Sequence, residues 1–117
     1  MTETFSQPDC IFCKITKRQI EAVIIEESDS YLAIRDINPQ APTHILIIPK
    51  EHYADITALT DPELTGKLFQ AAAAIASRQG LKDGFRLVVN NGVRAGQTVD
   101  HLHIHLLGGR QLTWPPG

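Results

Sequence analysis

The hydrophobic pattern of the chain is dominated by short apolar runs, each bounded by turn-forming residues. The run at 44–49 is apolar at nearly every position, which is typical of a strand buried on both faces, and Pro49 ends it. The two runs before it are separated only by Ser-Asp-Ser and predict a hairpin, and a Pro-containing loop at 37–43 follows. Strands are therefore expected at 22–27, 31–36, 44–49, 85–90 and 99–109.

Two other stretches have the period of a helix. Apolar side chains at positions 11, 12, 15 and 20 predict a short helix with Asp9 as its N-cap. A longer helix is expected to begin at Thr60, which forms a capping box with Glu63, and to end before Gly80. Asp61 and Pro62 would occupy its first turn. The apolar stripe of this helix consists of Leu64, Leu68, Ala71, Ala72, Ile75 and Ala76.

The order of these elements is helix, three strands, helix, two strands. No alternation of strands and helices enforces parallel pairing, so we expect an α+β domain with an antiparallel sheet of about five strands, one long and one short helix. The chain has 117 residues, of which 43% are hydrophobic, and this suits one compact domain. We place that domain at 10–117, after a polar N-terminal tail at 1–9.

Composition and charge narrow the possible partners. The formal net charge of −2 argues against a generic nucleic-acid binder. No apolar run approaches the length of a membrane span and no signal peptide is recognisable, so a cytoplasmic protein is expected. Cys10 and Cys13 form a C-x-x-C pair, which in a reducing compartment indicates metal binding or redox chemistry before a disulfide.

Three of the five histidines alternate with apolar residues in Asp-His-Leu-His-Ile-His-Leu-Leu at 100–107. On a strand, His101, His103 and His105 would share one face while the residues between them point into the core. This row could be a solvated polar face, a set of imidazole ligands for zinc, or a nucleophile with flanking groups that orient it.

The loop before this row favours the nucleophile. Gly96, Gln97 and Thr98 precede the histidines, and a glycine followed by successive backbone N–H groups makes a cavity suited to an anion. Thr98 adds a hydroxyl donor. A metal site alone has no need of a phosphate cradle, so the combination predicts phosphoryl chemistry.

The same residues resemble the signature of the histidine-triad (HIT) nucleotide hydrolases and transferases. DINPQAPTHILIIPK, GQTVDHLHIHLLGGRQ and the terminal WPPG are similar to the Hint branch, the purine nucleoside phosphoramidases. The likeness covers about 10–117. The Fhit-like dinucleotide hydrolases lack the terminal WPPG, and the uridylyltransferase branch has glutamine where this chain has His105.

The resemblance implies hydrolysis of adenosine 5′-monophosphoramidates or related AMP and GMP conjugates. His103 would attack the α-phosphorus and form a nucleotidyl-histidine, and His105 and Thr98 would contact the phosphate. His101 would orient His103 through its carbonyl, with His44 extending the network. Phosphate charge would be met by N–H donors, so Mg²⁺ is not required.

A nucleotide pocket follows from the same resemblance. Asp36 would accept hydrogen bonds from the ribose, and an apolar slot would hold the base. Without the resemblance, Asp36 is equally well explained as a loop cap and the slot residues as ordinary core. The nucleotide-binding residues implied are Ile11, Phe12, Ile15, Ile34, Asp36, Ile37, Asn90, Gly96, Gln97, Thr98, Val99, His103, His105 and Trp114.

For the cysteines, the resemblance implies a structural Zn²⁺ bound by Cys10, Cys13, His44 and His101. The alternative is two buried free thiols. His52 matches no role and is expected to be a surface or packing residue.

The terminal segment bears on the oligomeric state. The resemblance implies a homodimer in which two sheets join edge to edge and Trp114 of each tail approaches the other subunit's site. Two other functions stay open: a dinucleoside polyphosphate hydrolase, and a zinc-containing nucleotide-binding protein without robust catalysis.

Overall fold

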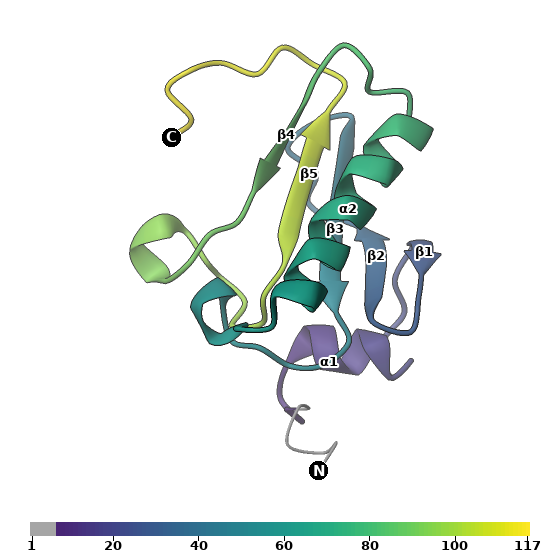
Figure 1. Ribbon diagram of the computed structural model, residues 1–117, viewed down its shortest axis with the longest axis vertical. Helices are drawn as coiled ribbons and strands as arrows, with labels where there is room; N and C mark the ends of the chain where they lie inside the picture. The colour runs from purple at the N-terminus through teal and green to yellow at the C-terminus, as the bar shows by residue number, and fades with distance from the viewer. Residues whose placement is uncertain (1–6) are drawn as a thin grey trace.

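Five strands form one antiparallel sheet in the order β1-β2-β3-β5-β4 in the computed structural model, which describes residues 7–117 (Figure 1). The expected α+β architecture is confirmed. The strands are β1 (Ile24–Glu27), β2 (Tyr31–Arg35), β3 (Thr43–Pro49), β4 (Phe85–Val88) and β5 (Ile104–Gly108). The helices are α1 (Ile11–Thr16) and α2 (Pro62–Arg78), with 3-10 turns η2 (Ile56–Ala58) and η3 (Val93–Ala95).

Both helices begin one residue later than the sequence suggested. Asp61, not Thr60, caps α2, because its carboxylate accepts the Glu63 N–H at 3.0 Å and Pro62 then fits the first helical position. Cys10, not Asp9, caps α1, and its Sγ accepts the Cys13 N–H at 3.4 Å. A sulfur atom thus takes the position of the usual capping oxygen.

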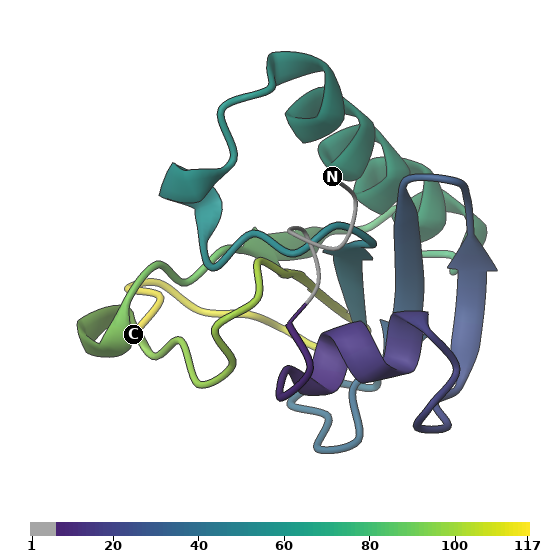
Figure 2. The same ribbon diagram turned by 90° about the horizontal axis from the view of Figure 1, so that it is seen from below.

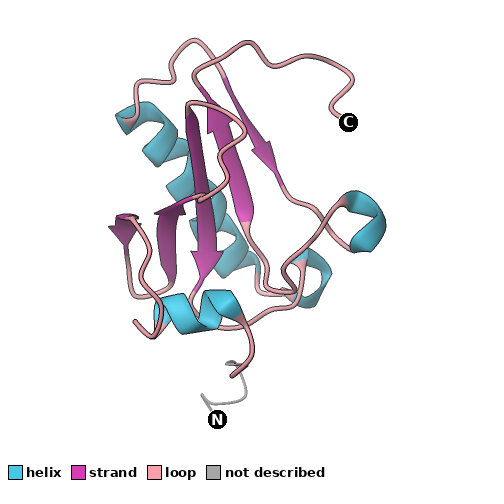
Figure 3. Cartoon of the chain, turned by 180° about the vertical axis from the view of Figure 1, so that it is seen from behind, coloured by secondary structure: helices cyan, strands magenta, loops and turns pink. Residues whose placement is uncertain are grey.

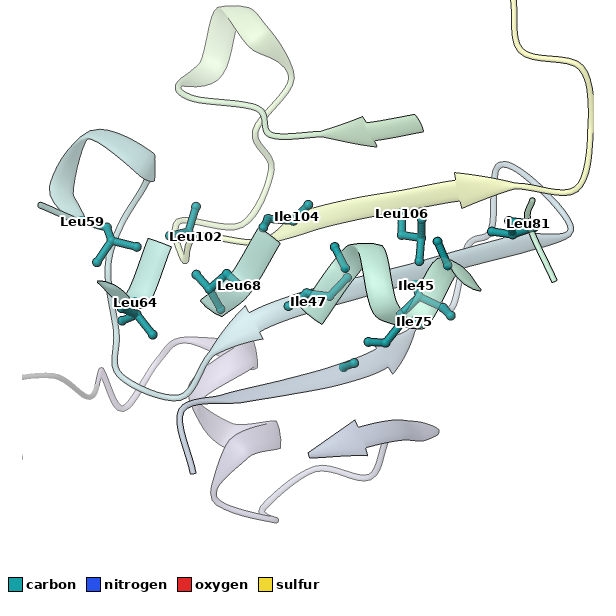
Figure 4. Close-up of a cluster of buried hydrophobic side chains, with 13 residues drawn as sticks. Ile45, Ile47, Leu59, Leu64, Leu68, Ile75, Leu81, Leu102, Ile104 and Leu106 are labelled. Carbon is teal, nitrogen blue, oxygen red and sulfur yellow. The ribbon is translucent and has the colours of Figure 1, made fainter. Parts of the chain in front are cut away.

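One face of the sheet is covered by α2, which lies in front of the strands in Figure 1 and behind them in Figure 3. All six residues of the predicted stripe of α2 are buried. Five of them, all but Ala71, pack against inward-facing side chains of β3 and β5, including Ile45, Ile47, Ile104 and Leu106 (Figure 4). The alanines of the stripe let the helix approach the sheet closely.

The other face packs against α1, so the two helices lie on opposite sides of the sheet (Figure 2). A second, smaller group of buried apolar residues lies here and consists of Phe12, Ile15, Leu32, Ile34, Leu46 and Ile48. The alternation of β2 and β3 sends Leu32 and Ile34 to this face and Ala33 to the α2 face.

The last strand is shorter than the expected 99–109. It begins at Ile104 because the residues before it leave the ladder, and the Leu102 N–H donates instead to the Tyr53 carbonyl at 2.6 Å. The alternation continues nevertheless, since Leu102 packs with Ile104 and Leu106 in the α2-facing core.

No helix within residues 7–117 is long and apolar enough to cross a membrane. Most of the expected N-terminal tail, residues 1–6, lies outside the described residues, so the tail boundary stays a prediction.

Candidate functional site

The histidines gather on the α1 face of the sheet, where β3 and β5 lie side by side. His105 is paired with Leu46 across the two strands, and His44 lies two residues before Leu46 on the same face. His44, His101 and His103 are all buried, and His105 is half-buried. The face is therefore an enclosed imidazole cluster, which argues against the solvated-face interpretation.

The protonation of His103 is fixed by the backbone. Its Nδ1 lies 2.6 Å from the carbonyl oxygen of His101, which can only accept, so the proton sits on Nδ1. The lone pair is left on Nε2. The ring stands edge to face with His105, 4.9 Å between centroids. His103 therefore has the tautomer that a nucleophile needs, held by the group that the resemblance implied.

His44 and His105 are fixed in the opposite sense. The Gln40 N–H donates to His44 Nδ1 at 3.0 Å, so the proton of His44 sits on Nε2. His44 Nε2 lies 2.9 Å from His105 Nδ1 and 3.3 Å from an Asp36 carboxylate oxygen. Since His105 accepts at Nδ1, its Nε2 carries a proton that it can donate. We call Asp36, His44 and His105 the phosphate relay.

Burial keeps these rings neutral. It lowers the pKa of His105 to about 4, with the neighbouring His103 and His44 adding to the effect. Burial also lowers the pKa of His103, against the hydrogen bond from its ring to the His101 carbonyl. For His44, burial lowers the pKa while the negative charge of Asp36 opposes it. At neutral pH, His103 offers a lone pair and His105 an N–H.

The loop predicted to bind phosphate turns at Gly96. Gly96 has φ of +93°, in the left-handed region that favours glycine. The Gln97 side chain is buried and braces the loop from inside: its Nε2 donates to the Ala54 and Val99 carbonyls, and its Oε1 accepts the Gly92 N–H. The bracing role of this side chain was not foreseen.

Two further loop residues complete this region. Thr98, the next residue after Gln97, is exposed and free to meet a ligand. Val88 of β4 pairs with His105, and the chain direction carries Asn90 from there toward His103. The chain after β4 therefore leads toward the histidine row.

The expected base slot is partly brought together. Phe12, Ile15 and Ile34 pack in the smaller core group, with Val99 against it, whereas Ile37 is 96% exposed. Phe12 stands edge to face with His103, 5.1 Å between centroids.

The edge of this slot is open. Ile15 and Ile37 both line a pocket of about 630 Å³, and Ile11 is also exposed. Trp114 is 82% exposed on the terminal segment that runs past β4 (Figure 1).

Four ligand-type side chains converge where α1 meets the end of β3 and the segment just before β5. We call Cys10, Cys13, His52 and His101 the metal tetrad, since their ligand atoms lie within 4.8 Å of one another. The predicted set needs one correction. His44 belongs to the phosphate relay, and His52 takes its place, with Nδ1 3.3 Å from Cys13 Sγ. The end of β3 adjoins the start of β5 in an antiparallel pair, so a histidine just after β3 reaches His101.

The tetrad fits Zn²⁺. A zinc ion with Zn–S of about 2.3 Å and Zn–N of about 2.0–2.1 Å places its four ligand atoms about 3.3–3.8 Å apart. His101 Nδ1 lies 3.2 Å from Cys10 Sγ, 3.6 Å from Cys13 Sγ and 3.1 Å from His52 Nδ1. His101 Nε2 donates to the Pro49 carbonyl at 2.9 Å, so Nδ1 presents a lone pair to this centre.

Charge at the tetrad follows from burial. Burial lowers the pKa of His101 to about 4 and raises the pKa of the Cys10 thiol. For His52 the pKa is lowered by burial, against the charge of Asp100. Both rings are therefore neutral at pH 7, as metal ligands must be, and a bound cation would deprotonate the thiols.

Asp36, His44 and His105 also lie close enough to suggest a metal. The Gln40 N–H argues against this, because it leaves the proton of His44 on the Nε2 atom that would have to bind the ion.

A family model, a curated relative and solved structures all match this chain over most of its length. The HIT domain family profile matches residues 17–112. A 14 kDa zinc-binding protein of Zea mays is 49% identical over 112 residues, which cover 92% of this chain and 87% of that protein.

Among solved structures, a HIT family hydrolase from Legionella pneumophila has a TM-score of 0.91 at 50% identity, covering 93% of this chain and all of the other. A histidine triad nucleotide-binding protein from Candida albicans has a TM-score of 0.81 at 31% identity, covering 92% of this chain and 83% of its own.

Proposed function

The chain belongs to the histidine-triad (HIT) family, and from this premise we infer that it is a purine nucleoside phosphoramidase that hydrolyses the P–N bond of AMP–amine conjugates. The observation that carries the proposal is the tautomer of His103. Its Nδ1–H is held by the His101 carbonyl, which leaves the lone pair on Nε2, and its ring lies 4.9 Å between centroids from the ring of His105.

The first half of the reaction forms a covalent intermediate. His103 Nε2 attacks the α-phosphorus, a P–N bond to histidine forms, and the P–N bond to the amine breaks. His105 Nε2–H, Thr98 and the loop backbone N–H groups stabilise the phosphoryl oxygens. The imidazole network supplies the proton that the departing amine requires.

The second half of the reaction breaks the bond between phosphorus and His103 and returns a proton to the imidazole network. Water attacks the nucleotidyl-histidine, AMP leaves, and His103 Nε2 regains its lone pair. One proton of the water returns to the network, so the cycle closes with no net change in the enzyme. Asp36 faces His44 and opposes the effect of burial on its pKa, which supports a proton being held there transiently.

Nucleotide recognition is assigned to the groups around this centre. Ile11, Phe12, Ile15 and Ile34, with Ile37 and Val99 at the edge, would form the base slot, and Asp36 would face the ribose. The open, apolar pocket beside Ile15 and Ile37 supports this assignment, since it offers a large apolar surface to a ring.

A structural Zn²⁺ is proposed for the metal tetrad. The zinc-binding protein of Zea mays and the donor set of the tetrad both support this. Zinc there would be closed by four protein ligands and so would tie α1 to the sheet without taking part in the chemistry.

A homodimer is proposed through β4. This strand lies at one edge of the sheet, its Phe85 is exposed, and the segment with the exposed Trp114 runs on the same side. An exposed edge and two exposed aromatic rings suit a second copy of the chain.

The test compares two substrates. The purified protein is incubated with an AMP–amine phosphoramidate and with a diadenosine polyphosphate, alongside His103→Ala, and AMP release is followed. We expect release from the phosphoramidate by the wild type alone. Faster release from the diadenosine compound would favour the dinucleotide hydrolase. Nucleotide binding without release from either would favour a zinc-containing binding protein.

A further inference from the structure

We propose that the metal tetrad and the nucleotide pocket are thermodynamically linked, so that zinc strengthens the binding of purine nucleotide and nucleotide strengthens the binding of zinc. The proposal rests on the function proposed above and adds a mode of regulation to the same site. Zinc occupancy would then change the affinity of the protein for its substrate.

The first connection is His101, which belongs to both sites. Its side chain has no exposed surface and faces the thiols through Nδ1, while its backbone carbonyl accepts the His103 Nδ1–H at 2.6 Å. Its Nε2–H is held by Pro49. A metal ion that fixes the His101 ring therefore also fixes the carbonyl that orients the nucleophile.

The second connection is Phe12, which lies on α1 between the two cysteines. Its ring is edge to face with His101, 5.7 Å between centroids, and with His103, 5.1 Å. The same short helix carries Ile11 and Ile15 of the proposed base slot.

A helix of six residues is not stable by itself, so its position depends on what anchors it. Its N-cap, Cys10, and a residue of its first turn, Cys13, both face His101. Zinc would thus anchor the base slot against the strand that bears the nucleophile. Loss of zinc would leave α1 held only by its apolar side chains, and nucleotide binding would have to order it again.

Metal exchange does not require unfolding. Cys10 and His52 line a pocket of about 470 Å³, and Thr98 of the phosphate loop lines it too. Both ligands are half-buried, so a chelator can reach the tetrad in the folded protein. The linkage can therefore be measured on the native chain.

The primary test uses the wild type without mutation. Zinc affinity is measured by competition with a chelating dye, with and without saturating AMP, and AMP affinity is measured by calorimetry on zinc-loaded and metal-free protein. We expect each ligand to tighten the other by the same factor, about tenfold, because linkage between two binding equilibria is reciprocal.

One substitution on α1 and one at its C-cap locate the connection. Phe12→Leu keeps an apolar side chain but loses the ring that touches both histidines, so we expect one zinc per chain and a coupling factor reduced toward one. Lys17→Ala, an exposed residue at the end of the same helix, is the matched control and is expected to keep the full factor.

The outcomes separate this proposal from the one it rests on. Equal zinc affinity with and without AMP, in a protein that binds both, would overturn the linkage and leave the phosphoramidase proposal intact. Failure of the zinc-loaded protein to bind AMP would contradict the nucleotide site itself. Failure to bind zinc would overturn the tetrad and the linkage together.

Discussion

In the metal tetrad, a backbone carbonyl holds Nε2 of His101 and leaves the Nδ1 lone pair facing two thiols. In the phosphate relay, a backbone N–H holds Nδ1 of His44 and leaves a proton on Nε2. The two regions use the same residue type on the same face of one sheet. What differs is the backbone group that meets the other ring nitrogen. A carbonyl at that nitrogen leaves a lone pair on the other one, which suits a metal ligand or, in the proposed function, a nucleophile; an N–H leaves a proton there, which suits a hydrogen-bond donor.

The comparison predicts its largest effect at His103. Its Nδ1, like the Nε2 of His101, is held by a carbonyl, and under the proposed function its Nε2 lone pair attacks the phosphate. His103→Ala should lower turnover of an AMP–amine phosphoramidate by about 10⁴-fold or more, because the lone pair of the neighbouring ring, His105, is already used to accept from His44. Zinc content should stay at one per chain. Turnover within tenfold of wild type would show that another group attacks.

Acid should destabilise both regions of the metal-free protein. His101 and His105 have a pKa of about 4 in the fold, below the ordinary value of 6.5. Between these pH values the unfolded chain binds protons that the folded protein does not, so the free energy of unfolding should fall as pH drops from 6.5 to 4. For the fully buried His101 alone the loss is roughly 3 kcal/mol.

Denaturant unfolding of chelated protein at a series of pH values measures this decline. His105→Asn removes one of the two rings and should make the decline shallower. A free energy of unfolding that is flat from pH 6.5 to 4 would be incompatible with neutral, buried rings.

Replacing His52 and His44 one at a time tests the assignment of His52 to the metal tetrad and of His44 to the phosphate relay. His52→Ala should lose the zinc ion and with it the stabilisation that zinc gives, about 2.7 kcal/mol at a free zinc concentration 100 times the Kd. His44→Ala should keep zinc and lower turnover by about 10²-fold, since it orients His105. Zinc content by mass spectrometry and melting curves with added zinc give the answer. Loss of zinc from His44→Ala would restore the ligand set expected from the sequence.

The smallest effect concerns two residues of one loop. Thr98→Ala removes a donor to the phosphate and should weaken AMP binding about fivefold. Asp100→Asn, two residues on, faces His52 and should leave AMP binding unchanged at saturating zinc. Calorimetry with AMP distinguishes the two. An equal loss in both variants would mean that the loop acts as one unit.

The sequence predicted the elements well because apolar periodicity reports burial directly. The stripe of α2 and the alternation from Leu102 to Leu106 follow from side chains that face one core, and β3 is apolar throughout because its two faces meet two apolar groups. Helix starts were less certain, since Thr60 and Asp61 are both good caps and the choice depends on where Pro62 fits. No capping preference points to the sulfur of Cys10.

Only the part of the candidate site that lies near the histidine row in the sequence could be predicted from the sequence. The histidine row, Gly96 and Thr98 could be proposed as one site because they are close together in the sequence. His52 was missed because its partners are far away in the chain, and only the pairing of β3 with β5 brings it to His101. Only the structure shows which ring nitrogen of His44 and of His101 carries the proton. The backbone N–H of Gln40 and the backbone carbonyl of Pro49 decide this, and backbone atoms carry no residue-specific signal in the sequence.

The claim that His103 attacks phosphorus is tested most directly by trapping the intermediate. The protein is mixed with an AMP–amine phosphoramidate, quenched within a turnover, digested and analysed by mass spectrometry. We predict an AMP adduct on the peptide that contains His103, located on that ring, and none in His103→Ala. Steady release of AMP with no adduct on any histidine, or an adduct on His105, would contradict the account.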